Sequence, residues 1–203
     1  MIHFFINIMT SEENKERFNN TLHELARQIQ LNAQTINIED ILSTIELILQ
    51  IHNSKNRIFV YGAGRSGFIG RSFAQRLMHL GIKSCFVSDA VTYQYSSQDL
   101  LIIISGSGET TSPVAIATKA KEIGGKIVLI SSNPKSTIGE LSDYVIEIKG
   151  KSKDMALVQE TLAPYTSLFD ISAFAVLDAI GGVLMKKLGV TEEDIDNRHA
   201  SIE

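Results

Sequence analysis

Cysteine, clusters of basic residues and long apolar runs are all scarce in this chain of 203 residues. Cys85 is the only cysteine, so no disulfide can form within the chain, which suits a reducing compartment. The Lys and Arg residues form no block and the net charge is −4, so the charge pattern of a nucleic-acid-binding protein is missing. No apolar run approaches the ~18 residues that indicate a membrane span, and the short apolar N-terminus lacks the features of a signal peptide. The composition therefore predicts a cytoplasmic protein that binds neither nucleic acid nor a membrane.

The balance of apolar and charged residues, 44% and 21%, is typical of a soluble globular protein. The length suits one domain. Residues 12–31 and 38–51 carry apolar side chains at helical spacing, which predicts two helices ahead of the first strand. We therefore expect one domain over residues 12–203, preceded by an N-terminal extension over 1–11.

Five short apolar runs alternate with helical patterns along the rest of the chain. The runs cover residues 57–61, 83–87, 99–105, 126–131 and 144–148. The helical patterns cover residues 66–80, 112–123, 137–142, 167–188 and 191–197. Because the runs are apolar almost throughout, we expect parallel strands that are covered on both faces. The predicted fold is α/β, with a doubly wound, five-stranded parallel sheet sandwiched by helices.

A glycine-rich segment follows the first predicted strand and opens a helix. Its sequence is Gly62-Ala63-Gly64-Arg65-Ser66-Gly67. Glycine allows a tight turn, and a helix N-terminus offers free N–H groups to an anion. The pattern also fits G-x-G-x-x-G, with Asp89 placed 22 residues after Gly67, where a dinucleotide-binding fold carries its ribose-binding acid. The segment alone leaves open a phosphate loop, a nicotinamide-binding loop and a turn that needs glycine only for steric reasons.

A second segment favours a compact anion. Residues 105–112 read Ser-Gly-Ser-Gly-Glu-Thr-Thr-Ser, between the third predicted strand and the next helix. Five hydroxyl groups beside backbone N–H groups at a helix N-terminus suit a phosphate monoester. A dinucleotide-binding domain has no need of a second phosphate site here, although a plain helix cap is also compatible with the residues. Two such loops predict a sugar phosphate as the ligand.

Several segments together resemble the sugar isomerase (SIS) family, and within it the 6-phospho-3-hexuloisomerases. They are 62–67, 73–81 (Phe-Ala-Gln-Arg-Leu-Met-His-Leu-Gly), 105–110, 167–170, 177–179 and the closing 198–203. The resemblance runs from about residue 20 to the end of the chain. It implies an SIS-type fold and interconversion of 3-hexulose 6-phosphate and fructose 6-phosphate through an enediol, without metal or cofactor. It also implies assembly into homotetramers.

The resemblance also implies roles for individual residues. The substrate contacts fall on Ser66, Ser105, Gly106, Ser107, Gly108, Glu109 and Thr110. The proton-transferring carboxylate falls on Asp170, where the family usually has glutamate in a Gly-Ser-Leu-Phe-Glu context and this chain has Thr166-Ser167-Leu168-Phe169-Asp170. A simple charge at a helix N-terminus is the alternative explanation of Asp170.

Two of the five histidines are further catalytic candidates. His199 lies in a polar tail, from which it could reach a neighbouring subunit and donate to the enediolate oxygen, as a backbone N–H could also do. His79 lies near a helix end, where a structural or interface role is at least as good an explanation. No pair of histidines has metal-ligand spacing, so we predict no metal site.

The apolar surface on the two N-terminal helices and on the closing helix exceeds what one sheet face needs, which predicts a homo-oligomer. The leading function is a ketose-phosphate isomerase whose partner is a small-molecule sugar phosphate. The alternatives are a sugar-phosphate-binding module with weak or different turnover, and a nucleotide-dependent oxidoreductase.

Overall fold

Five parallel strands form the sheet in the computed structural model of the chain, which describes residues 10–150, 161–199 and 201. The strands are β1 (Ile58–Gly62), β2 (Ser84–Phe86), β3 (Leu100–Ile104), β4 (Lys126–Ser131) and β5 (Tyr144–Glu147). Their order is β2-β1-β3-β4-β5, and every neighbouring pair is parallel. The predicted strands differ from these by at most one residue at each end, and residues 1–9 of the expected extension lie outside the described part of the chain.

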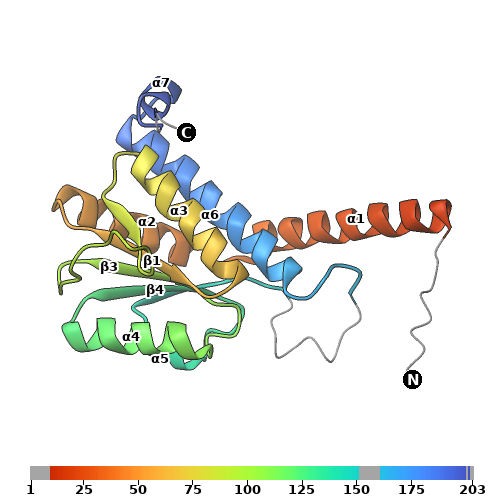
Figure 1. The fold of residues 1–203 in the computed structure, drawn as a ribbon, viewed down its shortest axis with the longest axis horizontal. Coiled ribbons are helices and arrows are strands. Elements are labelled where there is room, and N and C mark those ends of the chain that lie inside the picture. Colours follow the sequence, from red (N-terminus) through yellow and green to blue (C-terminus); the bar gives the residue numbers. More distant parts are fainter. Residues whose placement is uncertain (1–9, 151–160, 200, 202–203) are drawn as a thin grey trace.

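Helices cover both faces of the sheet, as the apolar runs predicted (Figure 1). One face carries α2 (Ile38–Asn53), α3 (Arg65–His79) and α6 (Ser167–Leu188), and the other carries α4 (Thr111–Ile123) and α5 (Thr137–Leu141). Alternate strand residues enter the two cores: Val60 and Ile102 pack on the first face, and Phe59 and Leu101 pack on the second. The expected doubly wound α/β fold is therefore confirmed.

The sequence correctly predicted where the long helix α6 ends and where the last helix, α7, begins. Gly189 terminates α6 with φ +65°, a left-handed conformation that glycine adopts readily. Thr191 caps α7 (Glu192–Asp196) and forms a capping box with Asp194. Within the described residues α6 is also long and apolar enough to cross a membrane, but half of its most apolar window is buried. Its packing against α1, α2 and α3 accounts for the buried half.

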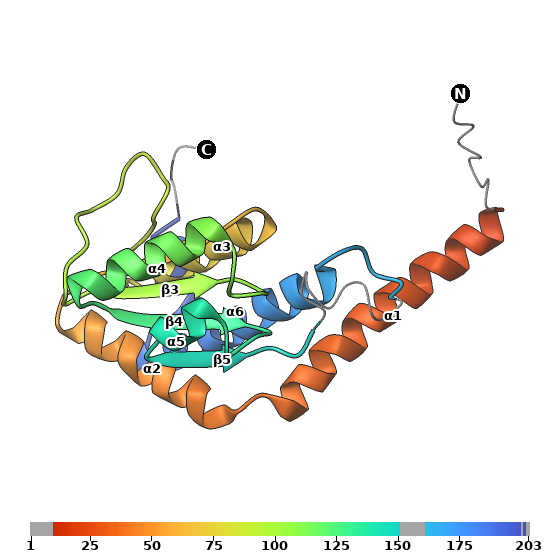
Figure 2. The same ribbon diagram turned by 90° about the horizontal axis from the view of Figure 1, so that it is seen from below.

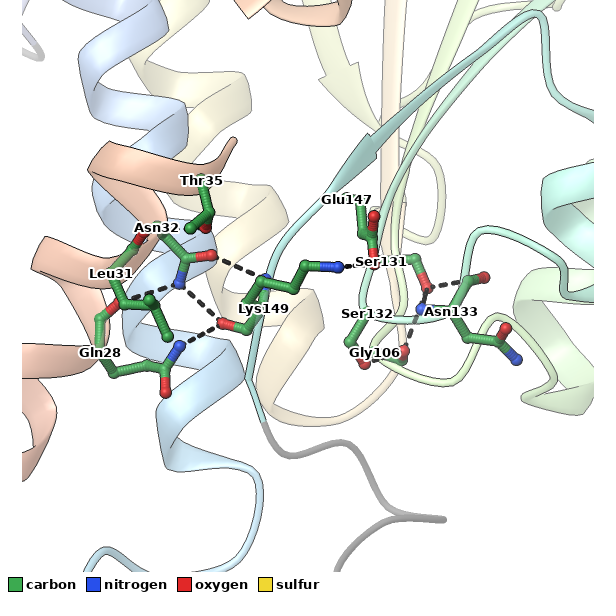
Figure 3. A network of polar contacts seen from close by, with 10 residues as sticks. All are labelled: Gln28, Leu31, Asn32, Thr35, Gly106, Ser131, Ser132, Asn133, Glu147 and Lys149. Atoms are coloured by element: carbon green, nitrogen blue, oxygen red, sulfur yellow. Dashed lines mark hydrogen bonds and ion pairs between the residues drawn. The ribbon is translucent and has the colours of Figure 1, made fainter. Parts of the chain in front are cut away.

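The first helix, α1 (Ser11–Thr35), extends beyond the body of the domain as an arm (Figures 1 and 2). It continues four residues past the predicted end at residue 31. The spacing of apolar residues did not predict this last turn, because the residue that the turn buries is polar. Asn32 is only 1% exposed, and its amide pairs with the backbone of Lys149, just after β5 (Figure 3). Both of these hydrogen bonds are 2.7 Å long.

The arm also holds the chain that leads into α6. The Arg17 guanidinium donates to the carbonyl of Leu162, and the Glu24 carboxylate accepts from the N–H of Ala163. Side chains of α1 therefore hold the backbone both after β5 and before α6. The second of these segments continues directly into the wall of the cavity described below.

Replacing Asn32 with alanine is expected to lower the free energy of unfolding by about 1–3 kcal/mol, because the buried Asn32 amide is removed and the N–H of Lys149 loses its acceptor. Chemical denaturation would measure the loss. Gln34→Ala is the matched control, since this residue is exposed in the same turn of α1, and it should change stability by less than about 0.5 kcal/mol. Equal stability of the two variants would contradict a structural role for the Asn32–Lys149 pairing.

Candidate active site

A cavity of about 330 Å³ opens at the carboxyl ends of β1 and β3. In this strand order the chain leaves β1 toward one edge of the sheet and β3 toward the other, so the loops after the two strands diverge. Ligands of open α/β sheets bind at this switch point. Three segments line the cavity: the β1–α3 loop, the β3–α4 loop and the chain at the start of α6.

The β1–α3 loop is a tight turn that its glycines make possible. A Cβ on Gly62 would lie 2.6 Å from the carbonyl oxygen of Ser66, and one on Gly67 would lie 2.7 Å from the carbonyl oxygen of Gly62. Gly64, at φ +56°, is the N-cap of α3 and leaves the first N–H groups of the helix without a side-chain cap. The cavity is lined here by Arg65 and Ser66, so the positive end of the helix dipole lies at its wall.

The β3–α4 loop is held in shape by its own hydroxyl groups. Ser105 Oγ accepts from the N–H of Gly108, and Ser107 Oγ accepts from the N–H of Glu109, both at 3.2 Å. Gly108 has φ +68°, and a Cβ there would overlap Ser136 Oγ. The hydroxyl groups of Ser105 and Ser107 can each still donate one hydrogen bond, and both residues line the cavity.

Residues at the end of β4 orient the peptide between Gly106 and Ser107. The carbonyl oxygen of Gly106 accepts from Ser131 Oγ at 3.0 Å, from Ser132 Oγ at 2.7 Å and from the N–H of Ser132 at 3.1 Å (Figure 3). The C=O and N–H of a trans peptide point in opposite directions. The N–H of Ser107 therefore points away from Ser131 and Ser132, which preorganises the loop for an anion.

Five of the seven predicted contact residues line the cavity: Ser66, Ser105, Gly106, Ser107 and Thr110. The other two, Gly108 and Glu109, do not line the cavity and support the loop from outside its wall. Gly108 is buried against Ser136. Glu109 accepts from the N–H and the hydroxyl of Thr137, each at 2.7 Å, and these two hydrogen bonds lower the pKa of its carboxyl. Glu109 thus connects the β3–α4 loop to α5.

The third segment brings Asp170 to the same cavity. Its side chain is only 4% exposed, and its Oδ2 accepts from Arg65 Nε at 2.7 Å and from Thr166 Oγ1 at 2.8 Å. Arg65 lies 105 residues away in sequence. The arrangement places one buried carboxylate beside two loops that suit an anion.

Sequence reasoning missed Arg65, Tyr165 and Thr166, which all line the cavity. A signal for Arg65 was present, because a cation in the first turn of a helix opposes the helix dipole and so suggests a functional reason. No comparable signal marked Tyr165 or Thr166, because their roles depend on the conformation of the chain before α6.

The two candidate histidines lie together, away from this cavity. The His79 and His199 rings are 4.2 Å apart between centroids, and Arg198 Nη1 donates to the carbonyl of His79 at 2.8 Å. His79 ends α3, whereas Arg65 begins it. At 1.5 Å per residue, these ends are separated by about 21 Å. Within one chain, neither histidine can reach the cavity that contains Asp170.

Asp89, the acidic residue of the dinucleotide-binding alternative, lies apart from the cavity wall. Asp89 pairs with Arg71 at 2.9 Å, and both side chains are nearly half exposed. Among the described residues, no group of three His, Cys, Asp or Glu side chains could hold a metal ion. The absence of a metal and of a cofactor from the reaction remains a prediction.

Comparison with known proteins gives a consistent picture. Residues 50–177 match the model of the SIS domain family. A Bacillus subtilis protein named 3-hexulose-6-phosphate isomerase is 36% identical over 89% of this chain and 96% of its own length. A Methanocaldococcus jannaschii protein of the same name is 40% identical over 72% and 77% of the two chains.

A solved structure from Methanococcus jannaschii, for which the function of 3-hexulose-6-phosphate isomerase was inferred, is also similar. It has a TM-score of 0.73 and 35% identity, and the match covers 95% of this chain and 99% of the other.

Ser107→Ala is expected to weaken the binding of a sugar phosphate by roughly 10- to 150-fold, because the loop loses one hydrogen bond to a charged group, worth about 1.5–3 kcal/mol. Isothermal titration with fructose 6-phosphate would measure the change. Ser97→Ala, on an exposed part of the 87–99 loop, is the matched control and should bind as the unmodified protein does. Unchanged affinity in a folded Ser107→Ala variant would remove this loop from the site.

Proposed function

This chain belongs to the SIS domain family, and from that premise we propose that it is an isomerase that interconverts 3-hexulose 6-phosphate and fructose 6-phosphate. The observation that carries the proposal is the buried Asp170 carboxylate, which shares one cavity with two anion-binding loops. The relatives named 3-hexulose-6-phosphate isomerase, at 36–40% identity, support it. The proposal needs neither a metal nor a cofactor.

The phosphate is expected to bind at the β3–α4 loop. Ser105, Ser107 and Thr110 offer hydroxyl groups there, and the N-terminus of α4 adds the favourable end of its dipole. This contact is remote from the reacting carbons, so its binding energy serves to position them. The sugar chain then extends toward the start of α6.

Asp170 is the proposed base. In the direction of fructose 6-phosphate, its carboxylate removes the proton from C2 and returns it to C3, while the hydroxyl proton of O2 transfers to O3. The intermediate is a cis-enediol, and one carboxylate can serve both carbons if it lies within hydrogen-bond reach of each. The reverse reaction uses the same group.

Arg65 is the proposed donor to the developing enediolate oxygen. Its Nε binds Asp170, and its guanidinium retains further N–H donors at the wall of the same cavity. Fixed donors directed at developing negative charge are a major source of rate enhancement. His79 and His199 are proposed to contribute from a second copy of the chain, since they lie at the far end of α3 from their own cavity.

We further propose a homotetramer. On α1, Phe18, Leu22 and Leu31 are 44–67% exposed, and on α6, Phe174 and Val183 are 40–42% exposed. Apolar side chains at this density on two helices favour burial against another copy. We also propose that the protein is cytoplasmic, because a chain with a single cysteine suits a reducing compartment.

Asp170→Asn is expected to lower kcat by at least about 100-fold, because the variant keeps the shape of the side chain and removes the base. Binding of fructose 6-phosphate, measured by titration, should change no more than a few-fold. Asp178→Asn is the control, because Asp178 lies on the same helix as Asp170 and its carboxylate forms a half-exposed ion pair with Arg76 of α3. This variant should retain the rate of the unmodified protein. Normal turnover by Asp170→Asn would exclude Asp170 as the base.

Asp170→Glu tests the alternative of a binding module. If the site is built for aspartate, the extra methylene displaces the carboxylate by about 1.5 Å and slows the reaction, because a misplacement of ~1 Å can cost ~100-fold in rate. A glutamate variant that is much faster than the unmodified protein would instead indicate a sugar-phosphate-binding module with weak turnover.

Phe18→Glu is expected to lower the molar mass measured by light scattering at micromolar concentration, because it places a charge on the exposed apolar face of α1. Asn20→Glu adds the same charge on the opposite side of the helix and should leave the mass unchanged. A monomeric unmodified chain would reject the oligomer, and with it the shared site that His79 and His199 require.

A further inference from the structure

Thr166, the residue before α6, has an unusual backbone conformation. Its φ is +63° and its ψ is −8°, in the left-handed region that β-branched residues rarely occupy. The other non-glycine residue with positive φ in the described part of the chain is Lys55, which is unbranched and lies in a turn after α2. Strain of this kind persists where the surroundings enforce it, and it clusters at functional sites.

Thr166 also does not act as a threonine N-cap usually does. Three other threonines are helix N-caps in the described part of the chain, and all three have an extended backbone; Thr110 also forms no side-chain cap hydrogen bond. Thr10 and Thr191 are extended, with ψ of 164° and 167°, and their hydroxyl groups accept from the N–H of the third helical residue. Thr166 forms no such bond with the described amides of α6. The position therefore combines a strained backbone with the loss of a stabilising cap.

The hydroxyl of Thr166 binds Asp170 instead. It donates to Oδ2 at 2.8 Å, and Arg65 Nε donates to the same oxygen at 2.7 Å. Two donors on Oδ2 restrict rotation of the carboxylate and leave Oδ1 as the oxygen available to a substrate. The Arg65 side chain is 62% exposed and has several rotatable bonds, whereas Thr166 is short and belongs to the same turn as Asp170. The threonine is thus the more rigid of the two supports.

We propose that Thr166 is a positioning residue, which is kept in a strained conformation because its hydroxyl orients the Asp170 carboxylate. The proposal rests on the assignment of Asp170 as the base. It predicts that strain and catalytic rate can be separated at this position, because releasing the strain should not restore the rate that is lost with the hydroxyl.

Thr166→Gly is the first test variant, because glycine adopts positive φ without strain and lacks the hydroxyl. We expect kcat to fall by about 10- to 100-fold and KM to change less than about threefold. Thr166→Val keeps the shape and loses the same hydrogen bond to Asp170, so kcat should fall as in Thr166→Gly, and because valine keeps the strain its Tm should be lower than that of the glycine variant. Thr166→Ser keeps the hydroxyl and should recover most of the rate that the other two variants lose.

Thr191→Gly is the matched control, since Thr191 is an ordinary N-cap. Loss of the Thr191 cap should lower the Tm and leave kcat unchanged. A Thr166→Gly variant with unaltered kcat, in a protein that otherwise turns over its substrate, would overturn the positioning role and leave the proposed function standing.

A readout independent of turnover separates the two proposals further. The side-chain carboxyl ¹³C resonance of Asp170 should shift in Thr166→Gly and Thr166→Val and return toward its original position in Thr166→Ser. A resonance that does not move in any of the three variants would refute the positioning role even if the chain has no isomerase activity. If the unmodified protein is inactive but the resonance moves in the variants as expected, the proposed function alone would be refuted.

Discussion

The parallel pairing of β1 with β3 is the constraint on which the site depends. The register joins Ile58 to Leu100 and continues to Gly62 and Ile104, so both strands end at the same level of the sheet. Each strand is followed by a loop and a helix, and the two helix N-termini consequently open onto one cavity. Two partial positive charges at the same edge attract an anion. The position of the cavity thus follows from backbone pairing before any side chain is considered.

The buried carboxylate of Asp170 requires compensation in such a place, because an unpaired buried charge is strongly unfavourable. Arg65 and Thr166 provide it, and both bind the same oxygen. This leaves the carboxylate oriented, with its other oxygen free to face the cavity. Thr166 and Asp170, the two positions at which the resemblance led us to expect glycine and glutamate, are hydrogen-bonded to each other.

The α1 arm links the site to the outer surface of the molecule. One side of α1 holds the backbone of Lys149 and of the segment at Leu162 and Ala163, which leads into α6 and Asp170. Another side of α1 exposes Phe18 and Leu22. A second copy that covered these residues would thus also contact the element that supports the start of α6.

The sequence by itself determined the sheet, its parallel direction and the two glycine-rich loops, because apolar runs, helical spacing and glycine are local signals. It also identified Asp170 and five residues of the cavity wall, through the loops and the family resemblance. Only the tertiary structure decided that Arg65 pairs with Asp170, that Glu109 binds Thr137 and that His79 meets His199. The same holds for the buried Asn32, whose partner lies 117 residues away. The partners of these polar side chains are set by how distant segments pack, and no local pattern records that information.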